Sequence, residues 1–172
     1  MGKSEVKTIN YYDGISRGYK NLYHDEQIKK ISLVKSYLPT NGNLLDLGCG
    51  DGVLNQFISE SVNLVSLDIS SELLKINSNP YLKIHGSILN LPIKDKSIEF
   101  LCSFSVFQDL SDVSKGVSEV KRVLSSGGVG IISFLKVSSK FDELCSLIEE
   151  NFEVMKRIED DVKDIIFVFK QK

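Results

Sequence analysis

Apolar residues along the chain follow two spacings, one typical of helices and one typical of buried strands. From Ile28 to Leu38 they recur at steps of three and four, which predicts a helix over 25–38 that ends before Pro39. Compact apolar runs without this spacing predict strands. We expect strands at 44–47, 64–67, 81–85, 97–104, 129–135, 152–158 and 164–169.

Stretches with helical spacing separate most of these strands. The clearest runs from Val113 to Leu124, where apolar residues recur at steps of four, three and four, and it ends at the glycines of 125–128. Further helices are expected just after residue 52, through 73–76 and through 141–148. Only a few residues separate the last two strands, too few for a helical crossover, so these strands should be antiparallel. The pattern predicts a doubly wound α/β fold with a mostly parallel sheet and one antiparallel strand.

The composition is that of a folded soluble protein. The chain has 172 residues, of which 42% are apolar and 26% are charged, and this length predicts one domain over 1–172. The formal net charge is −2, without a block of like charges, which argues against a nucleic-acid partner held by charge. The sequence leaves the oligomeric state open.

Segments for membranes, export or cross-linking are not expected. No stretch approaches the roughly 18–20 consecutive apolar residues that span a bilayer, and the start MGKSEVKTIN lacks the apolar centre of a signal peptide. We therefore expect a cytoplasmic protein without a membrane span. The cysteines at 49, 102 and 145 form no C-x-x-C pair, so neither a disulfide framework nor a metal site is expected.

The segment LLDLGCGDGVL, residues 44–54, carries the strongest chemical signal in the sequence. It reads as a strand that opens onto Gly48, Gly50 and Gly52 and then onto helical spacing. Glycines let a ligand approach the main chain, and a helix start points free backbone N–H groups toward it. This arrangement predicts a site for a nucleotide-like group.

An acid at the end of the next strand sharpens that prediction. Asp68 lies 20 residues beyond Gly48, where a carboxylate can accept both ribose hydroxyls of an adenosine. The spacing is G-x-G-x-G, and Val53 stands where a dinucleotide fingerprint has its third glycine. Asp46 would also face a pyrophosphate with like charge. A nucleoside that carries an amino group fits these residues better than a dinucleotide does.

Several motifs follow one another along the chain in a familiar order. They are LLDLGCGDG, VSLDIS, GSILNLPI, IEFLCSFSVFQDLSD and EVKRVLSSGG. In this order and spacing, residues 11–136 resemble the class I S-adenosylmethionine-dependent methyltransferases, especially the small branch that includes quinone-biosynthesis methylases. The opening YYDGISRGYKNLYHDEQ resembles that branch too.

The resemblance implies a fold, a cofactor and a division of the chain. The fold would be a Rossmann-like sheet of strand order 3-2-1-4-5-7-6, and the cofactor would be S-adenosylmethionine. Residues 1–43 would form an N-terminal lid and the first core helix, and residues 44–172 would form the cofactor-binding core. The acceptor of the methyl group would be a small molecule.

The resemblance also implies roles for single residues around the cofactor. The methionine end would be held by Asp46 and the backbone of Gly48, Cys49 and Gly50. Asp68 would hold the ribose, and Ile69 would pack on the adenine.

Other positions would surround the cofactor from the lid and from the fourth strand. Tyr12 and Tyr19 would cover it from the N-terminal segment. Ser103, Phe104 and Ser105 would face the methyl group that is transferred.

Two positions depart from the family pattern. Ser87 and Ile88 stand where an acid followed by an apolar residue usually binds the adenine amino group, and a hydroxyl is a weaker acceptor than a carboxylate. Gln108 and Asp109 stand where many relatives have two histidines. Asp109 could act as a base only if burial raised its pKa. A base is not required, since displacement from a sulfonium depends mainly on alignment in a water-poor cleft.

Alternatives to a methyltransferase remain open. Ser87, Gln108 and Asp109 are compatible with a catalytically inactive protein that binds S-adenosylmethionine. An NAD-dependent oxidoreductase is disfavoured by the glycine spacing and by Asp46. Single residues also have simpler interpretations, with Asp68 as a helix-start residue, Cys49 as a small residue in a tight turn, and the N-terminal tyrosines as a stripe packed on the core.

Overall fold

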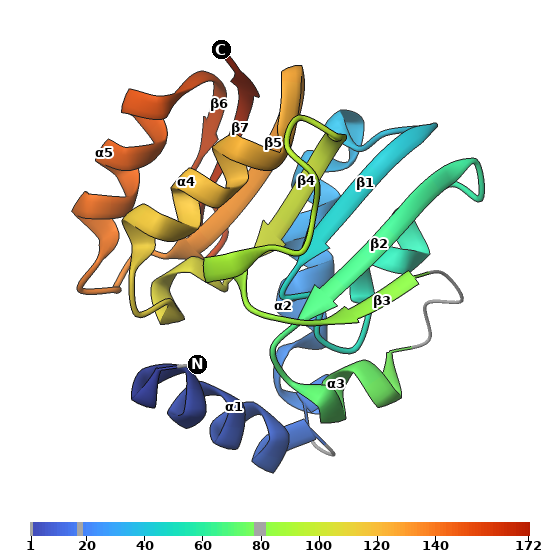
Figure 1. Cartoon of the computed structure of the whole chain (residues 1–172), viewed down its shortest axis with the longest axis vertical. Coiled ribbons are helices and arrows are strands. Elements are labelled where there is room, and N and C mark those ends of the chain that lie inside the picture. Colours follow the sequence, from blue (N-terminus) through green and yellow to red (C-terminus); the bar gives the residue numbers. More distant parts are fainter. Residues whose placement is uncertain (1, 17–18, 78–81) are drawn as a thin grey trace.

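A computed structural model describes residues 2–16, 19–77 and 82–172, and it leaves out the side chains of residues 3, 4 and 19–23 (Figure 1). Its centre is a seven-stranded sheet of order β3-β2-β1-β4-β5-β7-β6 within the described residues. The strands are β1 (Gly42–Leu47), β2 (Val62–Asp68), β3 (Leu82–His85), β4 (Ile98–Phe104), β5 (Leu124–Leu135), β6 (Phe152–Ile158) and β7 (Asp164–Gln171). β7 pairs antiparallel with both β5 and β6, whereas the other pairs are parallel. The predicted strand order and the single antiparallel strand are confirmed.

Helices cover both faces of this sheet. They are α1 (Lys3–Ile15), α2 (Tyr19–Val34), α3 (Ser71–Ile76), α4 (Val113–Val123) and α5 (Phe141–Asn151), with short 3-10 turns η2 (Lys35–Tyr37), η3 (Val53–Phe57), η4 (Ile88–Asn90) and η5 (Phe107–Asp109). α4 starts where the Asp112 side chain accepts a hydrogen bond from the Lys115 N–H at 2.8 Å. None of the helices within the described ranges combines the length and the apolar character needed to cross a membrane.

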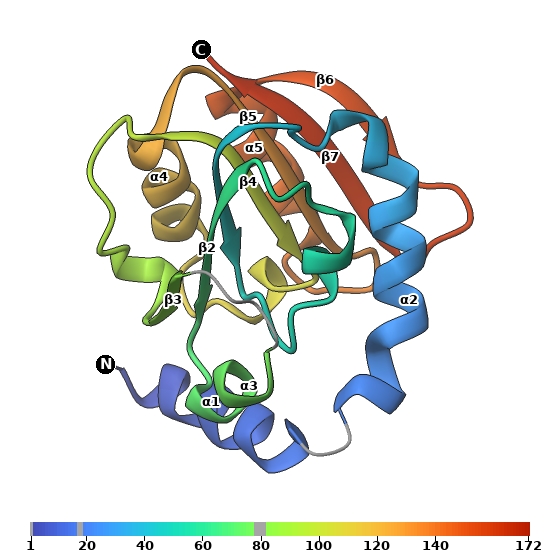
Figure 2. The same ribbon diagram turned by 90° about the vertical axis from the view of Figure 1, so that its right-hand side faces the viewer.

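The alternation of side chains along the strands creates two apolar layers. Leu45 points into a core that α4 and α5 cover, through Val117 and Ile148 among others. Its neighbour Leu44 points into the opposite core, which α2 covers through Ile31. Figure 2 shows α2 on one side of the strands and α4 on the other. The doubly wound prediction is therefore confirmed, and the central strands are buried on both faces.

Three predicted elements differ from the observed ones. The chain after the glycine turn forms only the 3-10 turn η3, which ends at Phe57 because Ile58 adopts an extended backbone. α2 begins at Tyr19 and gives way to η2 after Val34. β5 begins directly after α4, so residues 125–128 belong to the strand, where its register with β4 shifts. The expected start of the third strand at residue 81 lies outside the described residues.

The helix α1 lies across the ends of the strands that carry the sequence motifs. In Figure 1 it runs below the arrowheads of β1, β2 and β4, next to α3. The carboxyl ends of parallel strands are where doubly wound proteins bind their ligands. The fold therefore places the N-terminal helix over the predicted site.

Candidate functional site

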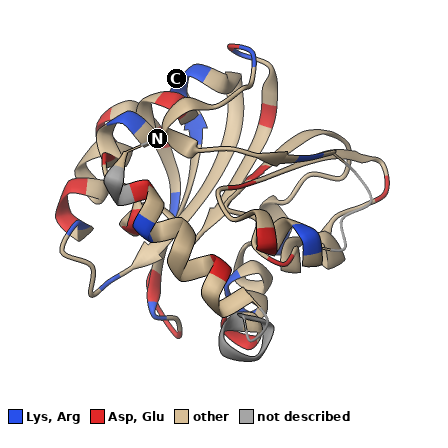
Figure 3. Ribbon diagram, turned by 60° about the horizontal axis from the view of Figure 1, so that its bottom comes forward, with Lys and Arg blue, Asp and Glu red and all other residues tan. Residues whose placement is uncertain are grey.

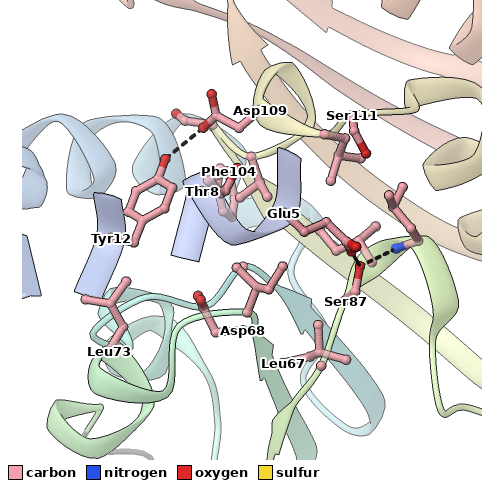
Figure 4. A pocket seen from close by; sticks show the side chains of 18 residues that line it. Glu5, Thr8, Tyr12, Leu67, Asp68, Leu73, Ser87, Phe104, Asp109 and Ser111 are labelled. Carbon is pink, nitrogen blue, oxygen red and sulfur yellow. Dashed lines mark hydrogen bonds between the residues drawn. The ribbon is translucent and has the colours of Figure 1, made fainter. Parts of the chain in front are cut away.

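A cavity of about 690 Å³, including its open mouth, lies at the carboxyl ends of β1, β2 and β4 under α1 (Figure 4). Its walls are mainly apolar and are formed by Leu67, Ile69, Leu73, Ile88, Leu89, Phe104, Val106 and Leu110, together with Gly48 and Gly86. Its polar side chains are those of Glu5, Thr8, Tyr12, Asp68, Ser87, Ser105, Asp109 and Ser111. Apolar walls with a few polar groups are typical of small-molecule sites.

A smaller cavity of about 330 Å³ lies beside the first. Its lining comes from α2, from the end of β1, from the glycine turn, from η3 and from Phe104 of β4, with Gln27, Asp46 and Asp51 as polar members. Gly48 and Phe104 line both cavities, so the two spaces adjoin at these residues. An elongated ligand could therefore extend from one cavity into the other.

The glycine turn between the cavities holds a backbone that other residues rarely adopt. Gly48 has a φ of 71°, and a Cβ atom built on it would lie 2.4 Å from Cγ2 of Val106. The N–H groups of Gly48 and Cys49 both donate to the Leu67 carbonyl oxygen, at 2.7 and 3.1 Å. The Gly50 N–H donates to Oδ2 of Asp68 at 2.8 Å. These three N–H groups are therefore not free for a ligand, because β2 runs alongside and supplies their acceptors.

Asp68 supports this turn from the end of β2 and lines the larger cavity. Its carboxylate accepts hydrogen bonds from the N–H groups of Gly50 and Ser70, both at 2.8 Å. Burial raises the pKa of Asp68, and the backbone donors oppose that rise. A carboxylate has about four lone-pair sites, so Asp68 keeps acceptor capacity for a ligand hydroxyl.

Asp46 is a buried acid whose pKa lies far from the usual value of an aspartate. It is 3% exposed, and burial together with the nearby Asp68 raises its pKa to about 8. Among the described side chains, no hydrogen bond or ion pair reaches its carboxylate. Oε1 of Gln27, on the wall of the same small cavity, is also buried without a hydrogen-bond partner in the described structure. When Asp46 is ionised, its carboxylate and Oε1 of Gln27 are two acceptors without donors in the described structure, and they fit a ligand with a cationic N–H donor group.

Side chains of α1 close the larger cavity through hydrogen bonds to its rim. They are Ser87 Oγ to Glu5 Oε1 at 2.6 Å, Tyr12 OH to Asp109 Oδ2 at 2.7 Å, and Ser70 Oγ to Asp13 Oδ1 at 2.5 Å. Figure 4 shows the first two of these contacts from within the cavity. Tyr12 thus lines the larger cavity from α1, whereas the side chain of Tyr19 is outside the described part of the chain.

The predicted catalytic positions separate in space. Asp109 lines the larger cavity, and burial raises its pKa, although the Tyr12 hydrogen bond and Lys140 oppose this. Gln108 is not among the residues that line either cavity. Its side-chain N–H donates to the Ser105 carbonyl oxygen at 2.6 Å, which supports the chain after β4.

Most of the remaining predicted residues line one of the two cavities, and Ser103 lines neither. Ile69, Ser87, Ile88 and Phe104 line the larger cavity. Cys49 lines the smaller one, where burial raises the pKa of its thiol, so it is no nucleophile. Ser103 is fully buried and donates to the Leu47 carbonyl oxygen at 2.9 Å, which keeps it out of both cavities. Within the described residues, no group of three or more His, Cys, Asp and Glu side chains is arranged to hold a metal ion.

Sequence reasoning did not identify a buried polar network behind the site. Lys30 is 2% exposed, and its Nζ donates to Oδ2 of Asp164 at 3.2 Å and also to the Ser105 hydroxyl. Ser105 donates to the same Asp164 oxygen at 2.6 Å and holds a left-handed φ of 59°. These residues lie on α2, after β4 and on β7, so no local pattern in the sequence signals their contact.

The sheet order, the glycine turn and the acid at the end of β2 define a Rossmann-like nucleotide-binding α/β protein. A family model described as a methyltransferase domain matches residues 45–132, which hold the turn, Asp68, Ser87 and the strand before Asp109. The chain belongs to this methyltransferase family, and S-adenosylmethionine is its cofactor.

Curated proteins and a solved structure are similar to this chain. An uncharacterised protein of Methanocaldococcus jannaschii is 27% identical over 150 residues, which make up 85% of this chain and 59% of that protein. The malonyl-(acyl-carrier protein) O-methyltransferase of Hamiltonella defensa is 37% identical over 100 residues, covering 56% of this chain and 39% of that protein. The chain thus spans about half the length of these relatives. In fold, an S-adenosylmethionine-dependent methyltransferase of Aquifex aeolicus has a TM-score of 0.76 at 16% identity, over 93% of this chain and 98% of that one.

Proposed function

We propose that this chain transfers the methyl group of S-adenosylmethionine to a small-molecule acceptor. The observation that carries the assignment of the site is that Asp46 and Oε1 of Gln27 lie in the smaller cavity without a donor from the described residues. The cofactor has one cationic N–H donor group, the ammonium of its methionine part. We therefore place that ammonium between Asp46 and Gln27.

The rest of the cofactor follows from this anchor. Asp68 lies at the end of β2, the neighbour of β1 that carries Asp46, and its free lone pairs suit the ribose hydroxyls. The sulfonium then lies where the cavities adjoin, beside Gly48 and Phe104. The cofactor supplies an electrophilic methyl group there, and the walls of this chain align the acceptor and exclude water.

Asp109 is the residue best placed to remove a proton from the acceptor. It lies on the wall of the larger cavity, and its raised pKa makes it a better proton acceptor than an exposed aspartate. Gln108 would position this turn through its hydrogen bond to the Ser105 carbonyl oxygen.

The size and charge of the site support a small acceptor. The larger cavity is roofed by α1, which leaves limited room beyond the cofactor. Figure 3 shows acidic and basic residues interspersed along α1 and along the segments around it, without a cluster of basic residues among those described in this view, as a nucleic-acid partner would require.

Calorimetry with the full chain tests the placement of the cofactor. S-adenosylhomocysteine should bind the wild type, and Asp68→Ala should weaken that binding by roughly tenfold or more, since it removes a charged acceptor. Asp46→Asn and Gln27→Leu should weaken S-adenosylhomocysteine but leave 5′-methylthioadenosine, which lacks the amino-acid part, nearly unchanged. Folded protein that gives no heat with S-adenosylhomocysteine would overturn the proposal. Equal loss of both ligands in Asp46→Asn would overturn the ammonium assignment.

A further inference from the structure

Glu5 brings a carboxylate from α1 into the larger cavity, at the end that is farthest along the sheet from Asp46. Its Oε1 accepts a hydrogen bond from the Ser87 hydroxyl at 2.6 Å, and its Oε2 accepts one from the Gly2 N–H at 2.8 Å. These donors lower the pKa of Glu5, so its side chain is ionised at neutral pH. Figure 4 shows Glu5 above the cavity with Ser87 beneath it.

The order of the strands shows which part of the cofactor reaches this end. β1, β2 and β3 are consecutive neighbours, and they carry Asp46, Asp68 and, just after β3, Ser87. Neighbouring strands are about 4.8 Å apart, so these positions mark three successive points along one line. With the methionine end at Asp46 and the ribose at Asp68, the base extends toward Ser87. This step rests on the proposed function.

The surroundings of that end suit a flat base with one polar edge. Its walls are apolar side chains of the strand ends and of η4, namely Leu67, Ile69, Ile88 and Leu89. Three carboxylates line the described part of the cavity, those of Glu5, Asp68 and Asp109. Asp68 faces the ribose, and Asp109 is bonded to Tyr12 after β4. Glu5 is therefore the carboxylate beside the base.

We infer that Glu5 binds the exocyclic amino group of adenine and that Ser87 positions Glu5 for this contact. An amino group donates to a carboxylate, whereas a base with a carbonyl oxygen at the same place would direct a lone pair at it. Each oxygen of Glu5 holds one protein donor and keeps a further lone pair for the ligand. The acid that position 87 lacks is thus supplied by a residue 82 positions earlier in the chain.

The consequence is that one helix both closes the site and selects the base. A residue that only closed the lid would stabilise every bound nucleoside alike. A residue that reads the amino group changes the ratio between two ligands that differ at that group. The ratio of affinities therefore separates base recognition by Glu5 from lid closure.

Calorimetry of the full chain with S-adenosylhomocysteine and with its deaminated analogue S-inosylhomocysteine measures that ratio. We expect the wild type to prefer the adenine ligand and Glu5→Ala to reduce the preference by roughly tenfold, the effect of one charge-assisted hydrogen bond. Glu5→Gln should reduce it further or invert it, because the glutamine N–H can donate to the hypoxanthine oxygen.

Two further variants control for folding and for the lid. Asp13→Ala removes the contact of α1 with Ser70 and should weaken both ligands by the same factor, leaving the ratio unchanged. Ser87→Asp in the Glu5→Ala background places an acid directly after β3, on the wall of the larger cavity. It should restore the preference for S-adenosylhomocysteine over S-inosylhomocysteine.

The outcomes distinguish the inference from the proposed function. If Glu5→Ala changes both affinities equally, as Asp13→Ala does, Glu5 is a lid residue and the inference fails while the cofactor assignment stands. If Ser87→Asp fails to restore the ratio while S-adenosylhomocysteine still binds, the base does not lie at Ser87 and the inference also fails. If no form of the folded chain binds S-adenosylhomocysteine, the proposed function itself fails.

Discussion

The hydroxyl of Tyr12 donates a hydrogen bond of 2.7 Å to the carboxylate of Asp109, across the mouth of the larger cavity. This bond joins α1 to the turn η5 after β4, two segments that are 97 residues apart in sequence. The position of α1 and the surroundings of the proposed base are therefore coupled. Burial raises the pKa of Asp109 and the Tyr12 donor lowers it, so a movement of α1 would change both contributions.

Tyr12→Phe should make bound cofactor leave faster. The variant loses one hydrogen bond that holds the lid, a change of about 1 kcal/mol or roughly fivefold. Stopped-flow measurement of S-adenosylhomocysteine release should show that increase. Tyr37→Phe is the matched control. Tyr37 packs against the apolar core between α2 and the sheet, and it lines neither cavity. Equal release rates for Tyr12→Phe and the wild type would show that α1 does not gate the site.

Asp46 should make the ligand-free protein less stable as the pH rises. Its pKa is raised from 3.8 to about 8, so between these values the folded chain binds a proton that the unfolded chain does not. Stability therefore falls with increasing pH across that window. Asp46→Asn should flatten this dependence and melt at a higher temperature than the wild type at pH 8, by about 2–4 °C per kcal/mol.

The same substitution should have the opposite effect on binding. A ligand ammonium favours the ionised form of Asp46, so wild-type binding of S-adenosylhomocysteine should release protons at neutral pH and strengthen as the pH rises. Calorimetry in buffers of different ionisation enthalpy measures the release. Asp46→Asn should bind more weakly and release fewer protons. The stability measurement has its own contrary outcome. If ligand-free Asp46→Asn is less stable than the wild type at pH 8, Asp46 has a stabilising partner in the folded protein.

The sequence predicted those features of the molecule that depend on neighbouring residues. Apolar runs such as 44–47 mark strands because a strand that is covered on both faces needs apolar residues throughout. Asp46, Gly48 and Asp68 lie within motifs whose spacing alone brings them to adjacent strand ends. The short turn η3 was predicted as an α-helix, because Val53, Leu54 and Phe57 have helical spacing. That spacing is the same whether the helix continues or ends after one turn.

The sequence did not reveal contacts that only the tertiary fold creates. Glu5 and Ser87 meet across 82 residues, and Gln27 reaches the cavity of Asp46 from a helix with mixed polar and apolar positions. The pKa of Asp109 depends on burial, which spacing does not report. The N–H groups of the glycine turn find the Leu67 carbonyl oxygen only because β2 lies beside β1.

Gly48→Ala should destabilise the chain and weaken cofactor binding. The alanine would have to adopt a φ of 71°, and its Cβ atom would lie 2.4 Å from Cγ2 of Val106. Gly127→Ala separates backbone strain from the steric contact. Gly127 has a φ of 72°, but a Cβ atom built on it has nothing within 4 Å. The backbone strain alone is about 1–2 kcal/mol. Chemical denaturation should show a larger loss for Gly48→Ala, and the added Val106→Ala change should recover part of it. Equal losses would mean that the contact with Val106 relaxes freely.

Lys30→Met should be one of the most destabilising single changes in the chain. Lys30 and Asp164 are 2% and 0% exposed, and removing the lysine leaves a buried carboxylate whose Oδ1 already has no partner within the described structure. Breaking one side of a buried ion pair costs about 3–5 kcal/mol. Lys29→Met, on the exposed side of the same helix, should change stability by less than about 0.5 kcal/mol.

The double variant Lys30→Met with Asp164→Leu tests why that loss occurs. Replacing both charges by apolar side chains removes the uncompensated carboxylate, so it should recover much of the stability that Lys30→Met loses. Ser105 would still lose two of its partners, and its left-handed φ of 59° would be held less firmly beside the larger cavity. We therefore expect recovery of the denaturation midpoint without full recovery of S-adenosylhomocysteine affinity. A double variant as unstable as Lys30→Met would show that packing of the lysine stem, and not its charge, stabilises α2 against the sheet.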